Sequence, residues 1–162
     1  MELIEGEATI EDVDAFLERV DEVAEATGAA VQVFDARYVV DREHIARAVE
    51  LARRERERGD GIARDMAVEI LLYAAGRRQI DRALAMGVSP GACPVVAVAV
   101  GGEEAAAARK LRALLTPATT LGAFDEERVC SFFDVTDRER RATAGTLEDI
   151  VHERVALLVV ER

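Results

Sequence analysis

The sequence predicts an α/β protein in which a small sheet is packed with several helices. In several segments, apolar residues recur at spacings of three and four, which is typical of helices with one buried face. Short β-branched or continuous apolar runs separate these segments, and such runs are typical of buried strands. The chain has 162 residues, half of them apolar, so we expect a single domain over 1–162.

The first part of the chain predicts a strand, a helix and a second strand. The first strand is expected over 1–8, and Thr9 follows as the cap of the helix. The helix ends at Gly28, and its apolar stripe consists of Val13, Phe16, Leu17, Val20 and Val23. The second strand is expected over 29–35, where valines alternate with Gln32.

The middle of the chain predicts three helices. Asp41 is a good cap for the first helix, which runs to about residue 58 before a glycine-rich break. The second helix is expected over 62–75, where Gly76 interrupts it. The third is expected to begin at once, over 77–86.

The last part of the chain predicts two further strands and four helices. The continuous apolar run 94–100 is typical of a central strand covered on both faces. An alanine-rich helix follows and ends near Leu115. The apolar run 155–160 is expected to form a second buried strand. Further helical segments are expected at about 126–133, 137–141 and 146–153.

Targeting and cysteine patterns predict a soluble cytoplasmic protein. No basic N-terminal region precedes an apolar run, and no segment approaches the roughly 20 apolar residues that a membrane span needs. Cys93 and Cys130 lie far apart without CxxC spacing, which fits a reducing compartment and no zinc site. We expect both cysteines to be buried as small apolar residues, and we expect no cofactor.

The net charge of −11 argues at first against nucleic acid as a partner, because phosphate binding depends on Lys and Arg contacts. Arginine supplies 20 of the 21 basic residues, however, which is typical of acidic, lysine-poor proteomes and says little about one protein's partner. Local charge is then the better guide. Segment 53–82 carries eight arginines and six acids, a balance of +2, whereas the rest of the chain carries −13.

Residue patterns for catalysis are missing from the sequence. Nucleophilic catalysis needs Ser, Cys or Thr beside a positioned base, and the chain has two serines and two histidines. His44 and His152 lie on predicted helices among charged residues, where solvated or capping roles are commoner. The Gly-Gly junction at 100–103 lacks a phosphate-loop pattern and has two acids where phosphate would bind. We therefore expect that the protein is not an enzyme.

One segment breaks a local rule. If a new helix begins directly after Gly76, Arg77 and Arg78 occupy its first turn, where the helix dipole disfavours each cation by a few tenths to about 1 kcal/mol. Such violations tend to mark functional sites. Two guanidinium groups beside unpaired backbone N–H groups suit a phosphate, and the amide of Gln79 can pair with a base edge.

Tyr73 and Ile80 can supply flat or apolar surface for an unstacked nucleotide. A structural interpretation stays open beside this one. Ile80 and Leu84 have the spacing of a core pair, and Tyr73 can be half-buried. The two arginines can also pair with Asp81 or Glu69.

The residues around this segment read EILLYAAGRRQIDRALAMGV over 69–88. This string resembles the central motif of the PRPK-binding protein family, whose members are subunits of the KEOPS tRNA-modification complex. In that family a helix with a glutamate ends in a Gly-x-Arg-Gln-Ile element, followed by an alanine-containing helix and a glycine. The similarity also covers 31–52, with Glu43 and His44, and 153–160. The motif positions are Glu69, Gly76, Arg78, Gln79, Ile80, Ala83 and Gly87.

The resemblance implies an α/β fold particular to the family and a subunit without catalysis. In KEOPS this subunit contacts a Bud-type atypical kinase/ATPase and captures tRNA, chiefly by the 3′ CCA end. The complex installs threonylcarbamoyl on the adenosine next to the anticodon, and a Kae-type metalloprotein subunit carries out the transfer. The alternative is a protein-interaction subunit that regulates the kinase without touching nucleic acid. The expected tRNA contacts are Tyr73, Gly76, Arg77, Arg78, Gln79 and Ile80.

Overall fold

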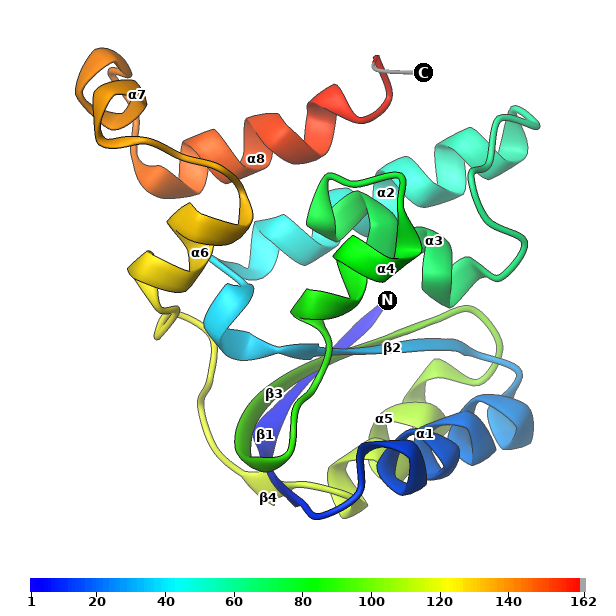
Figure 1. The fold of residues 1–162 in the computed structure, drawn as a ribbon. Coiled ribbons are helices and arrows are strands. Elements are labelled where there is room, and N and C mark those ends of the chain that lie inside the picture. The colour runs from blue at the N-terminus through cyan, green and yellow to red at the C-terminus, as the bar shows by residue number, and fades with distance from the viewer. Residues whose placement is uncertain (161–162) are drawn as a thin grey trace. The chain divides into compact units, whose positions relative to one another are not determined.

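The computed structural model describes residues 1–160 and has the α/β architecture that the sequence predicts. The chain forms two compact units, each made of two separate stretches of sequence (Figure 1). The sheet unit contains 1–36 and 87–121 and holds every strand of the described residues. The helical unit contains 37–86 and the described residues from 122 onward. The expectation of one domain over 1–162 stays a prediction.

The sheet unit is built on a four-stranded antiparallel sheet in the order β2-β3-β1-β4. The strands predicted over 1–8, 29–35 and 94–100 are confirmed, and the third of them is central. The short strand β4 does not follow from the sequence, because two residues are too few to show a period. The four strands are β1 (Glu2–Ile10), β2 (Ala30–Asp35), β3 (Gly91–Val100) and β4 (Thr116–Pro117).

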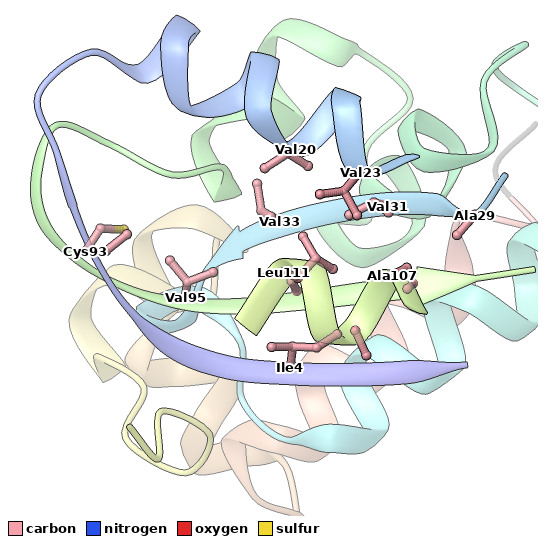
Figure 2. Close-up of a cluster of buried hydrophobic side chains, with 14 of the residues drawn as sticks. Ile4, Val20, Val23, Ala29, Val31, Val33, Cys93, Val95, Ala107 and Leu111 are labelled. Carbon is pink, nitrogen blue, oxygen red and sulfur yellow. The ribbon is translucent and has the colours of Figure 1, made fainter. Parts of the chain in front are cut away.

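Helices α1 (Val13–Thr27) and α5 (Glu104–Ala113) cover one face of this sheet. Alternate strand residues point toward them, because successive side chains of a strand lie on opposite faces. Figure 2 shows Ile4 and Val95 on the strands facing Leu111 of α5, within one buried apolar cluster. The core of the sheet unit therefore lies between the sheet and these two helices.

The start of α1 differs from the prediction. Thr9 lies inside β1, because the alternation of that strand continues to the buried residue Ile10. Asp12 caps the helix instead. Its carboxylate accepts hydrogen bonds from the backbone N–H groups of Asp14 (3.0 Å) and Ala15 (3.3 Å), which are unpaired donors of the first turn.

The helical unit contains six α-helices in its described residues, and a short 3-10 helix over Leu84–Met86 follows the third of them. Helix α2 packs against both α3 and α8, and its buried face includes the predicted residues Ile45 and Val49. The predicted cap Asp41 is confirmed, because its carboxylate accepts a hydrogen bond from the backbone N–H of His44 at 2.8 Å. The six helices are α2 (Arg42–Glu57), α3 (Met66–Ala75), α4 (Ile80–Ala83), α6 (Glu126–Phe132), α7 (Asp137–Ala142) and α8 (Leu147–Leu157).

The strand predicted over 155–160 is wrong, because α8 extends to Leu157 and a turn follows. A capping box between Thr146 and Asp149 starts this helix at the predicted residue, with bonds of 3.0 and 3.2 Å. A short apolar run does not by itself distinguish a buried helix from a strand. The buried residues that continue the helical spacing are Leu147, Ile150, Val151, Val155 and Leu158.

Candidate nucleic-acid interface

The predicted site lies where α3 ends and α4 begins, and its geometry is set from the start of α3. This helix begins at Met66 and not at residue 62, because Asp65 caps it and the preceding loop is bound by a side chain of the helix. The buried carboxylate of Glu69 accepts hydrogen bonds from the backbone N–H groups of Ile62 (2.9 Å) and Ala63 (2.6 Å). The glutamate of the motif therefore fixes the loop that precedes its own helix.

Gly76 ends α3 in a left-handed conformation, with φ 61° and ψ 32°. The N–H of Gly76 donates to the carbonyl of Tyr73, and the N–H of Arg77 donates to the carbonyl of Leu72, each at 3.1 Å. These bonds satisfy the last carbonyls of the helix. A Cβ at residue 76 would lie 3.2 Å from the carbonyl oxygen of Arg154 on α8, so glycine is favoured both by conformation and by space.

Arg77 is bound to the segment that follows α6. Its guanidinium donates a hydrogen bond to the carbonyl oxygen of Phe132 and lies 3.3 Å from a carboxylate oxygen of Asp134. The guanidinium carbon also lies 5.3 Å from the centroid of the Phe132 ring, a cation–π contact. The predicted place of Arg77 in the first turn of a helix is wrong, because α4 begins only at Ile80. Arg77 holds the chain in place.

A second arginine secures the corner that Arg77 contacts. Asp134 there has a φ of 55°, a conformation that costs a non-glycine residue on the order of 1–2 kcal/mol. The guanidinium of Arg154 donates to the carbonyl of Phe133 at 3.2 Å and to the carboxylate of Glu139 at 2.7 Å. The hydrogen bond between Arg154 and Glu139 raises the pKa of the arginine and lowers the pKa of the glutamate. Arg77, in the loop after α3, and Arg154, on α8, thus both hold this strained corner by hydrogen bonds.

The next two residues of the predicted site are available for a ligand. Arg78 and Gln79 are exposed, and their side chains make no hydrogen bond or ion pair with the residues that the structure describes. The pairing with Asp81 or Glu69, which the sequence left open, is not formed. Because α4 has only four residues and starts after Arg78, the dipole argument for this arginine does not apply. Arg78 is available for a ligand because its side chain forms no hydrogen bond or ion pair within residues 1–160.

Tyr73 differs from the prediction, because its side chain is 1% exposed and does not offer a surface for stacking. Burial raises the pKa of its hydroxyl, and the carboxylate of Glu69 raises it further. Ile80 and Leu84 are more exposed than the structural interpretation implies. Their side chains are 48% and 58% exposed, so they do not form a core pair. Sequence reasoning missed Leu84, since a spacing of four does not reveal whether a short helix turns that face inward.

A cavity of about 300 Å³ lies beside this exposed surface. It offers guanidinium groups, a carboxylate, a hydroxyl and the ring of a phenylalanine. Such a mixture can hold a polar aromatic ligand. The lining residues are Arg77, Asp81, Arg82, Ala85, Ser131 and Phe132.

His44 is fully buried, which corrects the expectation of a solvated or capping residue. Its Nε2 lies 2.7 Å from the carbonyl oxygen of Ala74 and therefore donates, while its Nδ1 accepts from the backbone N–H of Val40 at 3.3 Å. Burial lowers the pKa of His44 to about 4, so the ring is neutral near pH 7. His152 binds the carboxylate of Asp41 at 2.9 Å. Both histidines link elements of the helical unit.

Two further features are absent from residues 1–160. In this range, no group of three or more His, Cys, Asp or Glu side chains is placed to hold a metal ion. None of its helices combines the length and the apolar character needed to cross a membrane. Cys93 is buried as expected, whereas Cys130 is only partly buried.

Comparison with known proteins identifies one family. A family model described as kinase binding protein CGI-121 matches residues 10–158. The matched range includes the whole segment from α3 to α4 and all of α8. No curated protein matches the chain.

Proposed function

The chain belongs to the kinase binding protein CGI-121 family, the PRPK-binding protein family that its motif resembles, and from this we propose that it is the tRNA-binding subunit of a KEOPS-type complex. Family membership supports kinase binding and a regulatory role. In our proposal the kinase is a Bud-type atypical kinase/ATPase. The complex installs threonylcarbamoyl on the tRNA adenosine next to the anticodon, and a Kae-type metalloprotein subunit carries out the transfer.

The side chains of Arg78 and Gln79, which are exposed and unpaired within residues 1–160, carry the tRNA proposal. A guanidinium without an acidic partner suits a phosphate, and a side-chain amide suits the edge of a base. Ile80 and Leu84 add apolar surface on the same short helix and the turn that follows it. Apolar surface of this kind favours unstacked bases over a duplex, which agrees with capture of the single-stranded 3′ CCA end.

Three residues of the expected site act by positioning in this proposal. Gly76 sets the direction in which the chain leaves α3, and Arg77 ties the following residues to the corner at Phe132. Tyr73 fills the interior beneath them. Contact with tRNA therefore falls to Arg78 and Gln79, together with the exposed apolar residues Ile80 and Leu84.

We propose that the kinase binds at the C-terminal end of α8. Large exposed apolar side chains in residues 1–160 are confined to two pairs, one at α4 and one at the end of α8. The second pair is Leu157 and Val160, which are 36% and 75% exposed. Interface cores exclude charge, so an apolar patch on a chain with a net charge of −11 is a suitable centre for such a contact.

The alternative is a subunit that binds only proteins. The net charge of −11 and the structural roles of Tyr73 and Arg77 favour it. An electrophoretic shift with intact tRNA and with tRNA lacking its CCA end separates the two. We expect binding that weakens at least about tenfold when the end is removed. A protein that binds the kinase but neither tRNA would support the alternative.

A further inference from the structure

The outer edge of β1 is open over the first half of the strand. On one side β1 pairs with β3 along its whole length, from Glu2 to Ile10. On the other side it pairs with β4 only at Gly6 and Glu7. Within the described residues, no strand lies beside the outer edge of 2–5. Such an edge presents backbone donors and acceptors to which an extended chain can add.

The loop after β4 does not close this edge. A continued ladder would bring Ala118 opposite Glu5, since Pro117 lies opposite Gly6. The backbone N–H groups of Thr120 and Leu121 instead bind the Glu5 carboxylate, at 2.9 and 2.8 Å. The loop is thereby held by a side chain and not by the strand edge. The edge of 2–5 keeps its pairing capacity.

A groove of about 550 Å³ lies at the same place. Strand β1 contributes Leu3 to its lining, and Arg112 and Leu115 line it from the end of α5 and the residues that follow. Figure 1 shows β1, β4 and α5 as neighbours in the sheet unit. Gly6, further along β1, packs closely on Leu115, since a Cβ there would come within 2.8 Å of the leucine side chain. An open strand edge and a groove therefore coincide.

Arg112 indicates the charge of the occupant. Its side chain is exposed and makes no ion pair with any residue in 1–160. Among the residues that line the groove it is the one cation, and the carboxylate of Glu5, the one anion, already accepts hydrogen bonds from Thr120 and Leu121. A guanidinium binds a carboxylate through two parallel hydrogen bonds, which gives direction as well as affinity.

We propose that this groove binds an extended segment of a partner protein, which pairs with β1 and places a carboxylate on Arg112. An apolar side chain of the segment fits beside Leu3 and Leu115. A second copy of the chain is disfavoured, because antiparallel pairing of 2–5 with itself sets Glu2 opposite Glu5. The site lies in the sheet unit, so it does not depend on the tRNA and kinase surfaces of the helical unit.

The test uses the full chain and labelled hexapeptides of alternating valine and threonine, each with one glutamate at a different position to allow for register. Fluorescence anisotropy should detect binding of at least one peptide. Arg112→Glu should weaken it at least about tenfold, as should methylation of alternate peptide nitrogens. Arg109→Glu, at another exposed arginine of α5, should leave it unchanged.

Two kinds of outcome overturn the proposal. One is the absence of binding at millimolar peptide, or equal binding of the methylated and unmethylated peptides. The other is a dimer in sedimentation equilibrium that peptide does not dissociate and that Leu3→Pro abolishes, because the edge would then serve a second copy. Circular dichroism of each variant, with Arg109→Glu as reference, shows whether the fold is intact.

Discussion

Gly76 at the end of α3 lies against the backbone of Arg154 on α8, where an added Cβ would come within 3.2 Å of the carbonyl oxygen. This contact joins the proposed tRNA segment to the helix that ends in the proposed kinase surface. Leu157 lies less than one helical turn beyond Arg154, about 4.5 Å along the axis. The two proposed surfaces thus share one closely packed contact.

Gly76→Ala should lower the free energy of unfolding by about 2–3 kcal/mol, because a side chain adds contact with the Arg154 carbonyl to the cost of a left-handed conformation. Gly59→Ala is the matched control. Its φ is 79°, but no atom of residues 1–160 beyond its two chain neighbours lies within 4 Å of the added Cβ, so we expect a loss of about 1 kcal/mol. Urea unfolding measures both losses. Equal losses would mean that the close contact of Gly76 with α8 adds nothing to the cost of the substitution.

Arg78→Glu should weaken tRNA binding at least about tenfold without changing the melting temperature, because the exposed guanidinium has no partner in the described residues. Arg138→Glu on α7 is the control for net charge, since Arg138 is also exposed and has no ion pair within residues 1–160. Filter binding at one fixed salt concentration measures both. A comparable loss in the two variants would show that only overall charge matters.

Arg77→Ala should lower the stability of the protein, whereas Arg78→Glu should not. Removal of the guanidinium leaves the carbonyl of Phe132 and the carboxylate of Asp134 without their donor. Hydrogen bonds to charged groups contribute about 1.5–3 kcal/mol, and we expect a loss of unfolding free energy in that range. Thermal melting of Arg77→Ala beside Arg78→Glu is the measurement. A stable Arg77→Ala variant that fails to bind tRNA would assign Arg77 to the ligand instead.

Ile80→Glu and Leu157→Glu should have opposite effects on the two partners. Ile80→Glu should weaken tRNA binding and spare the kinase, because Ile80 lies on the exposed surface of α4. Leu157→Glu should remove kinase binding and spare tRNA, because charge is excluded from interface cores. Co-purification with the kinase at two salt concentrations and a tRNA shift assay measure both. Loss of both partners in either variant contradicts the separation of the surfaces.

Acid should destabilise the protein through His44. Desolvation by burial is the largest effect and lowers its pKa from 6.5 to about 4. The hydrogen bond to Ala74 and the charge of Asp41 raise the pKa by less, and the charge of His152 lowers it slightly. Between these pH values the unfolded chain binds a proton that the folded chain does not, so stability falls as the pH falls from 6.5 to 4 and the loss then levels off. The shift corresponds to at most about 3 kcal/mol.

His44→Gln is the control for this pH dependence, because glutamine can donate to the Ala74 carbonyl and does not titrate. Urea unfolding of both proteins between pH 4 and 7 measures the effect. We expect the wild type to lose more stability than the variant as the pH falls. Parallel pH profiles would show that acid destabilisation comes from the carboxylates alone.

Local patterns in the sequence predicted much of the fold. Alternation or continuous apolar character identified three of the four strands, and Asp41 and Thr146 were correctly identified as helix caps. These signals are local, because a cap acts within its first turn and a strand period shows within a few residues. The motif from Glu69 to Gly87 likewise identified the family, which the match over residues 10–158 confirms.

Only the tertiary structure decided which arginine of the motif is available. Arg77 and Arg78 are adjacent and chemically identical, yet Arg77 donates to a carbonyl 55 residues away, while Arg78 forms no hydrogen bond or ion pair in the described chain. Packing likewise determined the conformation of the apolar run 155–160, because Val155 and Leu158 lie on the buried face of a helical segment. A partner distant in sequence leaves no mark on local spacing. The sequence therefore determined the family and most elements, and long-range contacts determined which side chains are left to bind.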